Sequence, residues 1–130
     1  MPAMAMKHDK DPSQVLLDKV GSLKGVEIPG NQVLLAIYER PQVTAGGIRL
    51  PDKYRDEERY QGKAAVVVAK GQRAFDEGYR KNFGDMTAEI GDWIVIRPSD
   101  GWPVTVNGVL CRMITDEAIK MKVDSPDRVW

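Results

Sequence analysis

The chain has 130 residues, and its 19 Lys and Arg balance its 19 Asp and Glu, so the formal net charge is zero. A balanced charge gives no broad positive field to hold a phosphate backbone, which argues against a nucleic-acid-binding protein. The 42% hydrophobic content suits one core, and there is no apolar run near the ~20 residues that span a bilayer, so we expect one small domain outside the membrane.

The first residues argue against a signal peptide and against several kinds of active site. Met1–Met6 is short and weakly apolar, and charged residues follow from Lys7 onward, so we expect a cytoplasmic protein. The single histidine, His8, lies in the same stretch. One histidine can build neither a histidine-based triad nor a multi-histidine metal site. We expect no enzyme activity, no metal and no cofactor.

Residues 10–21 carry the signals of a short helix. Asp11 suits the N-cap, Pro12 suits the first helical position, and Gly21 can take the left-handed conformation that ends a helix. The segment has a small apolar face made by Leu16, Leu17 and Val20. Ten residues do not stay helical alone, so this face must dock on something. The sequence leaves two partners open, namely the helix's own domain and a neighbouring subunit reached by an arm.

From Val26 onward the pattern changes to strands. Residues 31–40 have apolar residues on both alternating faces, which predicts a strand buried on both sides. Residues 62–71 and 93–97 repeat this pattern between Gly or Pro residues. We expect Trp93 and Trp102 to lie in the core or in an interface.

The C-terminal third predicts a hairpin and a last strand. Asn107-Gly108 between two β-rich runs satisfies the positive φ angles of a type I′ turn. The only cysteine, Cys111, cannot form an intrachain disulfide, and its apolar neighbours indicate a buried thiol in a reducing compartment. After a short turn at 115–117, a half-exposed strand is predicted from three alternating apolar residues, Ile119, Met121 and Val123. A strand at the chain end invites pairing with another chain.

Two connections exceed the usual length for a compact domain. Residues 41–60 contain Gly46-Gly47 and a charged run, and loops of this length are usually functional or disordered. Residues 72–89 carry aromatic residues at intervals of four, which we interpret as a small satellite core. These aromatic residues are Phe75, Tyr79 and Phe83.

The order of these segments resembles the co-chaperonin family, the GroES-type ring that caps the chaperonin folding chamber, over residues 26–123. The matching pieces are residues 31–35, 44–51 (TAGGIRLP), 62–71, 90–95 and 109–119. Of these, 44–51 inside the long loop is the most specific. The resemblance implies an all-β fold, a small GroES-like antiparallel β-barrel. It would carry an N-terminal arm with a short helix (1–25), a mobile loop (41–60), a roof-like loop (72–89) and a tail (124–130).

The resemblance also implies a binding site and an assembly. In that family the mobile loop presents a short apolar strip to a GroEL-type chaperonin ring, and the residues at this position here are Gly46, Gly47, Ile48, Arg49 and Leu50. Arg49 stands where the family usually has a third hydrophobe. The terminal strands pair between adjacent subunits, usually of a seven-membered ring, which implies an interface at Ile119, Met121 and Val123. ATP is used by the chaperonin and not by the co-chaperonin.

Two functions follow as alternatives. The first is a co-chaperonin, phage-encoded and divergent, that helps to fold a client such as a capsid protein in the host cytoplasm. The second is a GroES-fold virion protein, a capsid decoration or vertex protein, that uses its arm to hold neighbouring subunits. A co-chaperonin should need Ile48 and Leu50 and should tolerate loss of residues 1–24, whereas a virion protein should show the reverse.

Overall fold

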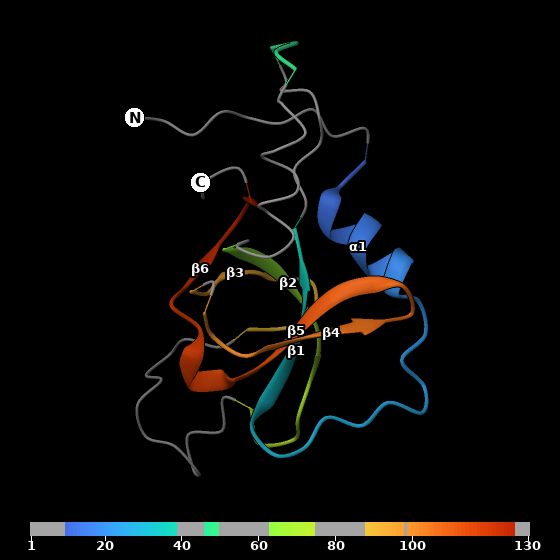
Figure 1. The fold of residues 1–130 in the computed structure, drawn as a ribbon, viewed down its shortest axis with the longest axis vertical. Coiled ribbons are helices and arrows are strands. Elements are labelled where there is room, and N and C mark those ends of the chain that lie inside the picture. Colours follow the sequence, from blue (N-terminus) through green and yellow to red (C-terminus); the bar gives the residue numbers. More distant parts are fainter. Residues whose placement is uncertain (1–9, 39–45, 50–62, 75–87, 98, 127–130) are drawn as a thin grey trace.

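The computed structural model describes residues 10–38, 46–49, 63–74, 88–97 and 99–126. Within them the chain forms one α-helix, one 3-10 helix and six strands, so the fold is all-β as the sequence predicts (Figure 1). The elements are α1 (Pro12–Val20), β1 (Gln32–Ile37), β2 (Ala64–Lys70), β3 (Trp93–Val95), β4 (Trp102–Val106), β5 (Val109–Thr115), η1 (Asp116–Ala118) and β6 (Met121–Val123). No helix in these ranges is long and apolar enough to cross a membrane.

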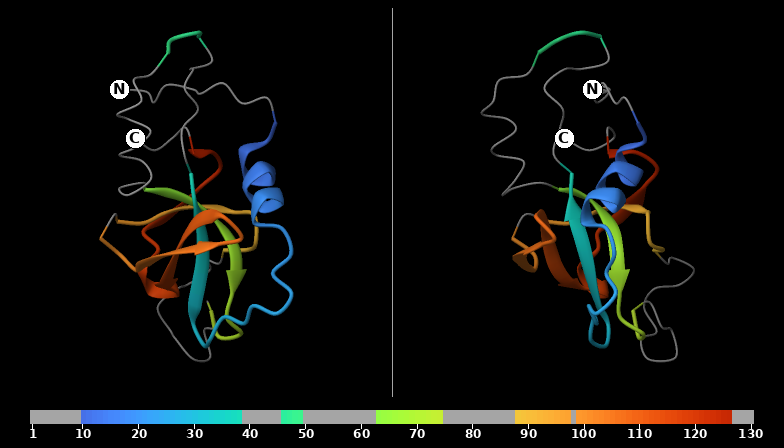
Figure 2. Two further views of the ribbon diagram at one scale, coloured as in Figure 1. Left: turned by 45° about the vertical axis from the view of Figure 1, so that its right-hand side comes forward. Right: turned by 90° about the vertical axis from the view of Figure 1, so that its right-hand side faces the viewer.

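The six strands form one antiparallel sheet in the order β4-β5-β1-β2-β3-β6. The central strand, β1, pairs with β5 on one side and with β2 on the other. Its register with β2 shifts between Leu34 and Leu35, and such an irregularity bends a strand and increases its twist. The sheet curls into a barrel-like shape, which the views in Figures 1 and 2 show.

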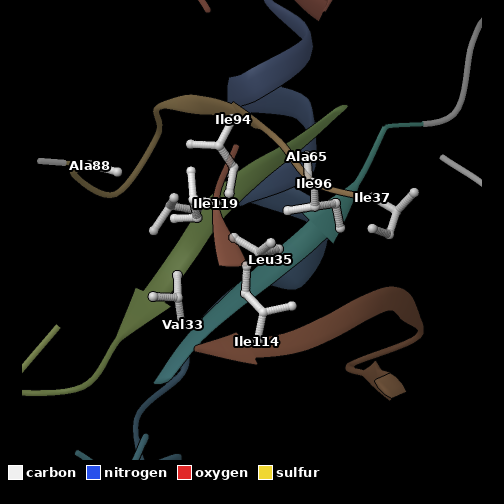
Figure 3. Close-up of a cluster of buried hydrophobic side chains, with 10 residues drawn as sticks. Val33, Leu35, Ile37, Ala65, Ala88, Ile94, Ile96, Ile114 and Ile119 are labelled. Carbon is white, nitrogen blue, oxygen red and sulfur yellow. The ribbon is translucent and has the colours of Figure 1, made fainter. Parts of the chain in front are cut away.

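The inner face of the sheet holds one hydrophobic core (Figure 3). β1 contributes Val33, Leu35 and Ile37, which are at most 2% exposed. The buried residues around them are Ala65, Val67, Ala88, Ile94, Ile96, Ile114 and Ile119. Because side chains alternate along a strand, the residues between these face the other side of the sheet.

The outer face of the sheet is apolar as well. Leu34 and Ala36 of β1 and Tyr38, the residue that follows this strand, are buried in a second cluster. Tyr38 meets Trp93 of β3 edge to face, with 5.4 Å between the ring centroids. The other buried members are Val20, Ala64, Val66, Val68, Cys111 and Met113. The prediction of a first strand buried on both sides is therefore confirmed.

α1 supplies the cover for this outer face (Figure 2). Asp11 is its N-cap and accepts a hydrogen bond from the backbone N–H of Ser13 at 3.0 Å. Gly21 ends it with a φ of 68°, and its N–H donates to the carbonyl of Leu17. Leu16, Leu17 and Val20 pack on the outer cluster, so the helix docks on its own domain, the first of the two alternatives.

The predicted hairpin is confirmed. Val106 of β4 pairs with Val109 of β5, and the two turn residues have positive φ angles, 50° at Asn107 and 81° at Gly108. Cys111 is a free, buried thiol in β5, as predicted.

Trp102 is 57% exposed, because its strand lies at the edge of the sheet, where β5 is its only neighbour among the described strands. It is therefore not a core residue, and its place in an interface, the other half of the expectation, stays a prediction. One prediction of position is wrong. The last strand begins at Met121 and not at Ile119. Ile119 follows η1 and is only 8% exposed in the inner core, because the 3-10 turn directs the chain inward before β6 starts.

Candidate functional site

The predicted binding strip lies partly within the described residues. Gly46, Gly47, Ile48 and Arg49 are described and exposed, whereas Leu50 lies outside the described residues. In all three views this segment stands beyond the end of the sheet at which β1 finishes (Figures 1 and 2). The candidate site is therefore carried by a connection and not by the sheet itself.

The backbone of this strip turns at Gly47. Its φ is 90°, a conformation that L side chains rarely adopt, and a Cβ built there would meet no atom within 4 Å. Ile48 follows directly and is 58% exposed, the largest exposed fraction among the large hydrophobic residues of the described ranges. An exposed aliphatic side chain on such a turn suits contact with an apolar surface of another molecule. Arg49 beside it is exposed and adds a positive charge.

The two edges of the sheet differ in their ability to pair with another strand. β4 contains Pro103, which has no N–H to donate, and proline in an edge strand opposes pairing with a further strand. β6 contains no proline, and its first residue, Met121, is 51% exposed. Lys122 of the same strand forms an ion pair with Asp92 at 3.1 Å. Of the two edges formed by the described strands, β6 is therefore the one better suited to pairing with another chain.

The predicted interface residues do not all lie at this edge. Met121 and Val123 lie in β6, opposite Val95 and Trp93 of β3. Ile119 lies in the inner core of its own chain, so it is placed apart from the other two. Trp130 and the aromatic residues of the 72–89 loop lie outside the described residues, and so does the charged run of the long loop.

Sequence reasoning missed two buried charged residues that are hydrogen-bonded to the segments before β1 and before β4. Asp116 is fully buried and accepts a hydrogen bond from Nδ2 of Asn31 at 3.2 Å, while its own N–H donates to the carbonyl of Asn31 at 3.0 Å. Arg112 is 8% exposed and donates from Nη1 to the carbonyl of Asp100 at 3.0 Å. Asn31 is 85 positions from Asp116, and Asp100 is 12 positions from Arg112. No local sequence pattern therefore pointed to these contacts.

The pKa shifts among the described residues come from burial and from a surface hydrogen bond. Burial raises the pKa of the Cys111 thiol to about 11, which keeps it neutral and poorly reactive. A hydrogen bond from Arg97 lowers the pKa of Asp100, and the two side chains meet at 3.2 Å on the surface. The described ranges contain no group of three or more His, Cys, Asp or Glu that could hold a metal ion.

A comparison with protein families agrees with this geometry. The family model described as Chaperonin 10 Kd subunit matches residues 26–123, which is more than half of the chain. The matched region contains all six strands, the 46–49 strip and the β6 edge, while α1 precedes it. A comparison with curated proteins gave no match.

Proposed function

Because the chain belongs to the chaperonin 10 Kd subunit family, whose members are co-chaperonins, we propose that it caps an ATP-driven chaperonin ring and assists protein folding there. The contact is made by residues 46–50, with Ile48 and Leu50 as apolar anchors. The partner hydrolyses the ATP, so this chain needs neither a nucleotide nor a metal. Co-chaperonins in general are not enzymes, and we propose no reaction for this chain.

The observation that carries this proposal is the exposed Ile48 on the turn at Gly47. Fully burying one aliphatic side chain contributes about 1.5–3 kcal/mol, so a single strip binds weakly. Several strips on one assembly raise the overall affinity through effective concentration. Weak individual contacts therefore permit firm capping together with release during the partner's cycle.

We propose that the assembly is a homo-oligomeric ring, and a heptamer as is usual in the family. The matched region begins at Val26 and ends at Val123. In this family the terminal strands pair between adjacent subunits, and we assign that pairing to these two ends. Val26 is 43% exposed, and Met121 in β6 is 51% exposed. Both ends thus offer apolar side chains for contact with a neighbouring copy.

The virion alternative depends on an arm that holds neighbouring subunits. The described part of the arm packs on its own sheet, which favours the co-chaperonin. The phage origin and a capsid client stay predictions. The packing also changes the test, because deleting residues 1–24 removes α1 from the outer face and damages the domain under either function. Point substitutions in the strip are the better probe.

The test is nucleotide-dependent co-sedimentation with a chaperonin ring. The wild type is compared with the double variant Ile48→Asp/Leu50→Asp and with Thr105→Asp, which places one such carboxylate on an exposed residue of β4. We expect binding that requires nucleotide, is lost in the double variant and is kept in Thr105→Asp. If the folded wild-type oligomer does not bind, or if the double variant binds equally well, the proposal fails.

A further inference from the structure

The C-terminal end of α1 is bonded to the turn of the β4–β5 hairpin. Nδ2 of Asn107 donates to the carbonyl of Val20 at 2.7 Å and lies 3.3 Å from the carbonyl of Ser22. The last carbonyls of a helix have no partner within the helix, so this amide supplies one that α1 lacks. Asn107 has two tasks, since its positive φ also forms the hairpin turn.

α1 also lies close to the turn that precedes β3. Residues 89–92 form this turn, in which Asp92 N–H donates to the carbonyl of Glu89 at 3.0 Å. A methyl group added at Gly91 would lie 3.8 Å from Cδ1 of Leu17, so Leu17 of the helix lies beside the turn. α1 therefore touches structures next to β4 and next to β3, strands that are separated by three others in the sheet order.

Between these two contacts α1 covers an apolar surface. Its buried residue Val20, together with Leu16 and Leu17, packs on the cluster that contains Tyr38, Val66 and Trp93. Without α1 this apolar surface would be exposed, and contiguous exposed apolar surface favours association with other chains. The outward residues of α1 are polar, for example Gln14 and Asp18, which are hydrogen-bonded to each other at 2.9 Å.

We propose that α1 is a strap, locked by Asn107, that closes the outer face of the sheet and braces the β4–β5 hairpin against the turn before β3. The strap is a conformational element of this chain and lies outside the family-matched region. Opening it exposes the Tyr38–Trp93 surface while the inner core stays closed. The outer face can therefore open without unfolding of the barrel.

The lock is tested with two substitutions that keep the turn. Asn107→Gly and Asn107→Asp both suit a positive φ in a hairpin, but neither supplies the amide donor. Hydrogen exchange of the full chain is measured at two amides of the helix. The N–H of Val15 donates to the carbonyl of Asp11 in the first turn, and the N–H of Gly21 donates to the carbonyl of Leu17 at the C-terminal end. We expect exchange about 2- to 10-fold faster at these amides in both variants, the effect of one lost hydrogen bond. Unchanged exchange in α1, or equal acceleration across β4 and β5, overturns the lock.

The cover is tested with Trp93 as a reporter. Trp102→Phe and Trp130→Phe remove the other two of the three tryptophans. In this background Val20→Lys places a charge beneath the helix, and Asp18→Lys places the same side chain on its exposed side. We expect longer-wavelength emission and stronger acrylamide quenching of Trp93 in Val20→Lys only, with the hairpin amides still protected. Trp93 emission that is the same in both variants contradicts the strap. If Val20→Lys does not fold, the hydrogen exchange of Asn107→Gly and Asn107→Asp tests the strap instead.

Discussion

At the scale of single residues, Gly47 sets the direction of the strip that carries Ile48. We predict that Gly47→Val weakens chaperonin binding, because a β-branched residue at a φ of 90° costs about 1–2 kcal/mol and shifts the turn to another conformation. The expected loss is about 5- to 30-fold in affinity per strip. Gly47→Asn is the matched control, since Asn accepts positive φ more readily.

The measurement for Gly47 is binding of the oligomer to the chaperonin, with thermal unfolding recorded alongside. A Cβ at this position meets open space, so the only cost to stability is the backbone strain, and we expect a lower unfolding temperature in Gly47→Val than in Gly47→Asn. Equal binding by the Val and Asn variants would show that the turn geometry does not matter for the contact.

Cys111 gives a pH-dependent prediction at the same scale. Its pKa rises from the ordinary thiol value of 9.0, which applies to the unfolded chain, to about 11 in the folded one. Between these values the unfolded state loses its proton first, so the free energy of unfolding decreases as the pH rises. We predict a steeper loss of stability from about pH 9 to 11 for the wild type than for Cys111→Ala, measured by urea unfolding with a reductant present. Parallel curves for the two proteins would contradict the buried neutral thiol.

At the scale of elements, η1 fixes the junction between β5 and β1. Asp116 opens η1, is fully buried, and exchanges hydrogen bonds with Asn31 just before β1. We predict that Asp116→Ala lowers the free energy of unfolding by about 1–3 kcal/mol, because Asn31 loses a partner in a buried site. Glu117→Ala, at the exposed neighbour, should change it by about 0.5 kcal/mol or less. Chemical denaturation of both variants checks this, and similar losses in the two would assign the effect to η1 as a whole.

The elements that the sequence predicted are those with local signals. Asp11 and Gly21 mark the ends of α1, and Asn107-Gly108 marks the hairpin, because caps and turns are decided by adjacent residues. The burial of Ile119 and the exposure of Trp102 depend on which strand lies beside them. Alternation along the chain gives the two faces of a strand but not its place in the sheet, so Ile119 was misplaced and the choice between core and interface for Trp102 was left open.

The candidate site was predictable in a different way. The double Gly and the Ile48-Arg49 pair were found by resemblance to a family motif, and the structure adds the turn at Gly47 and the exposure of Ile48. The contact between Asn107 and Val20 joins residues 87 positions apart. No local pattern reports such a contact, so the sequence left the docking of α1 open.

At the scale of the whole molecule, the two edges of the sheet differ, which suits the ring proposed above. A ring requires each copy to present two different surfaces, so that the contact between neighbours is heterologous. Pro103 opposes pairing at the β4 edge, whereas β6 presents Met121 without such protection. Pairing at β6 with the segment that begins at Val26 of the next copy uses two different surfaces of one chain and is therefore compatible with a closed ring.

The edges can be compared directly with one substitution at each. We predict that Met121→Glu dissociates the oligomer, because the same charge recurs at every contact between neighbours and a carboxylate is costly to bury there without a partner. Thr105→Glu places the same group on an exposed residue of β4 and should leave the assembly intact. Native mass spectrometry of both variants reports the number of subunits, with exchange of the core amides showing that each monomer is folded.

The outcome for Met121→Glu also bears on chaperonin binding. A folded monomer keeps its Ile48 strip but loses the effective concentration that several strips share, so its capping of the chaperonin should fall much further than its stability does. If Met121→Glu remains assembled while Thr105→Glu dissociates, then the β4 edge is the interface and Pro103 does not protect it. If both remain assembled, the subunits meet through neither edge, and the oligomer is held by surfaces other than the edge strands.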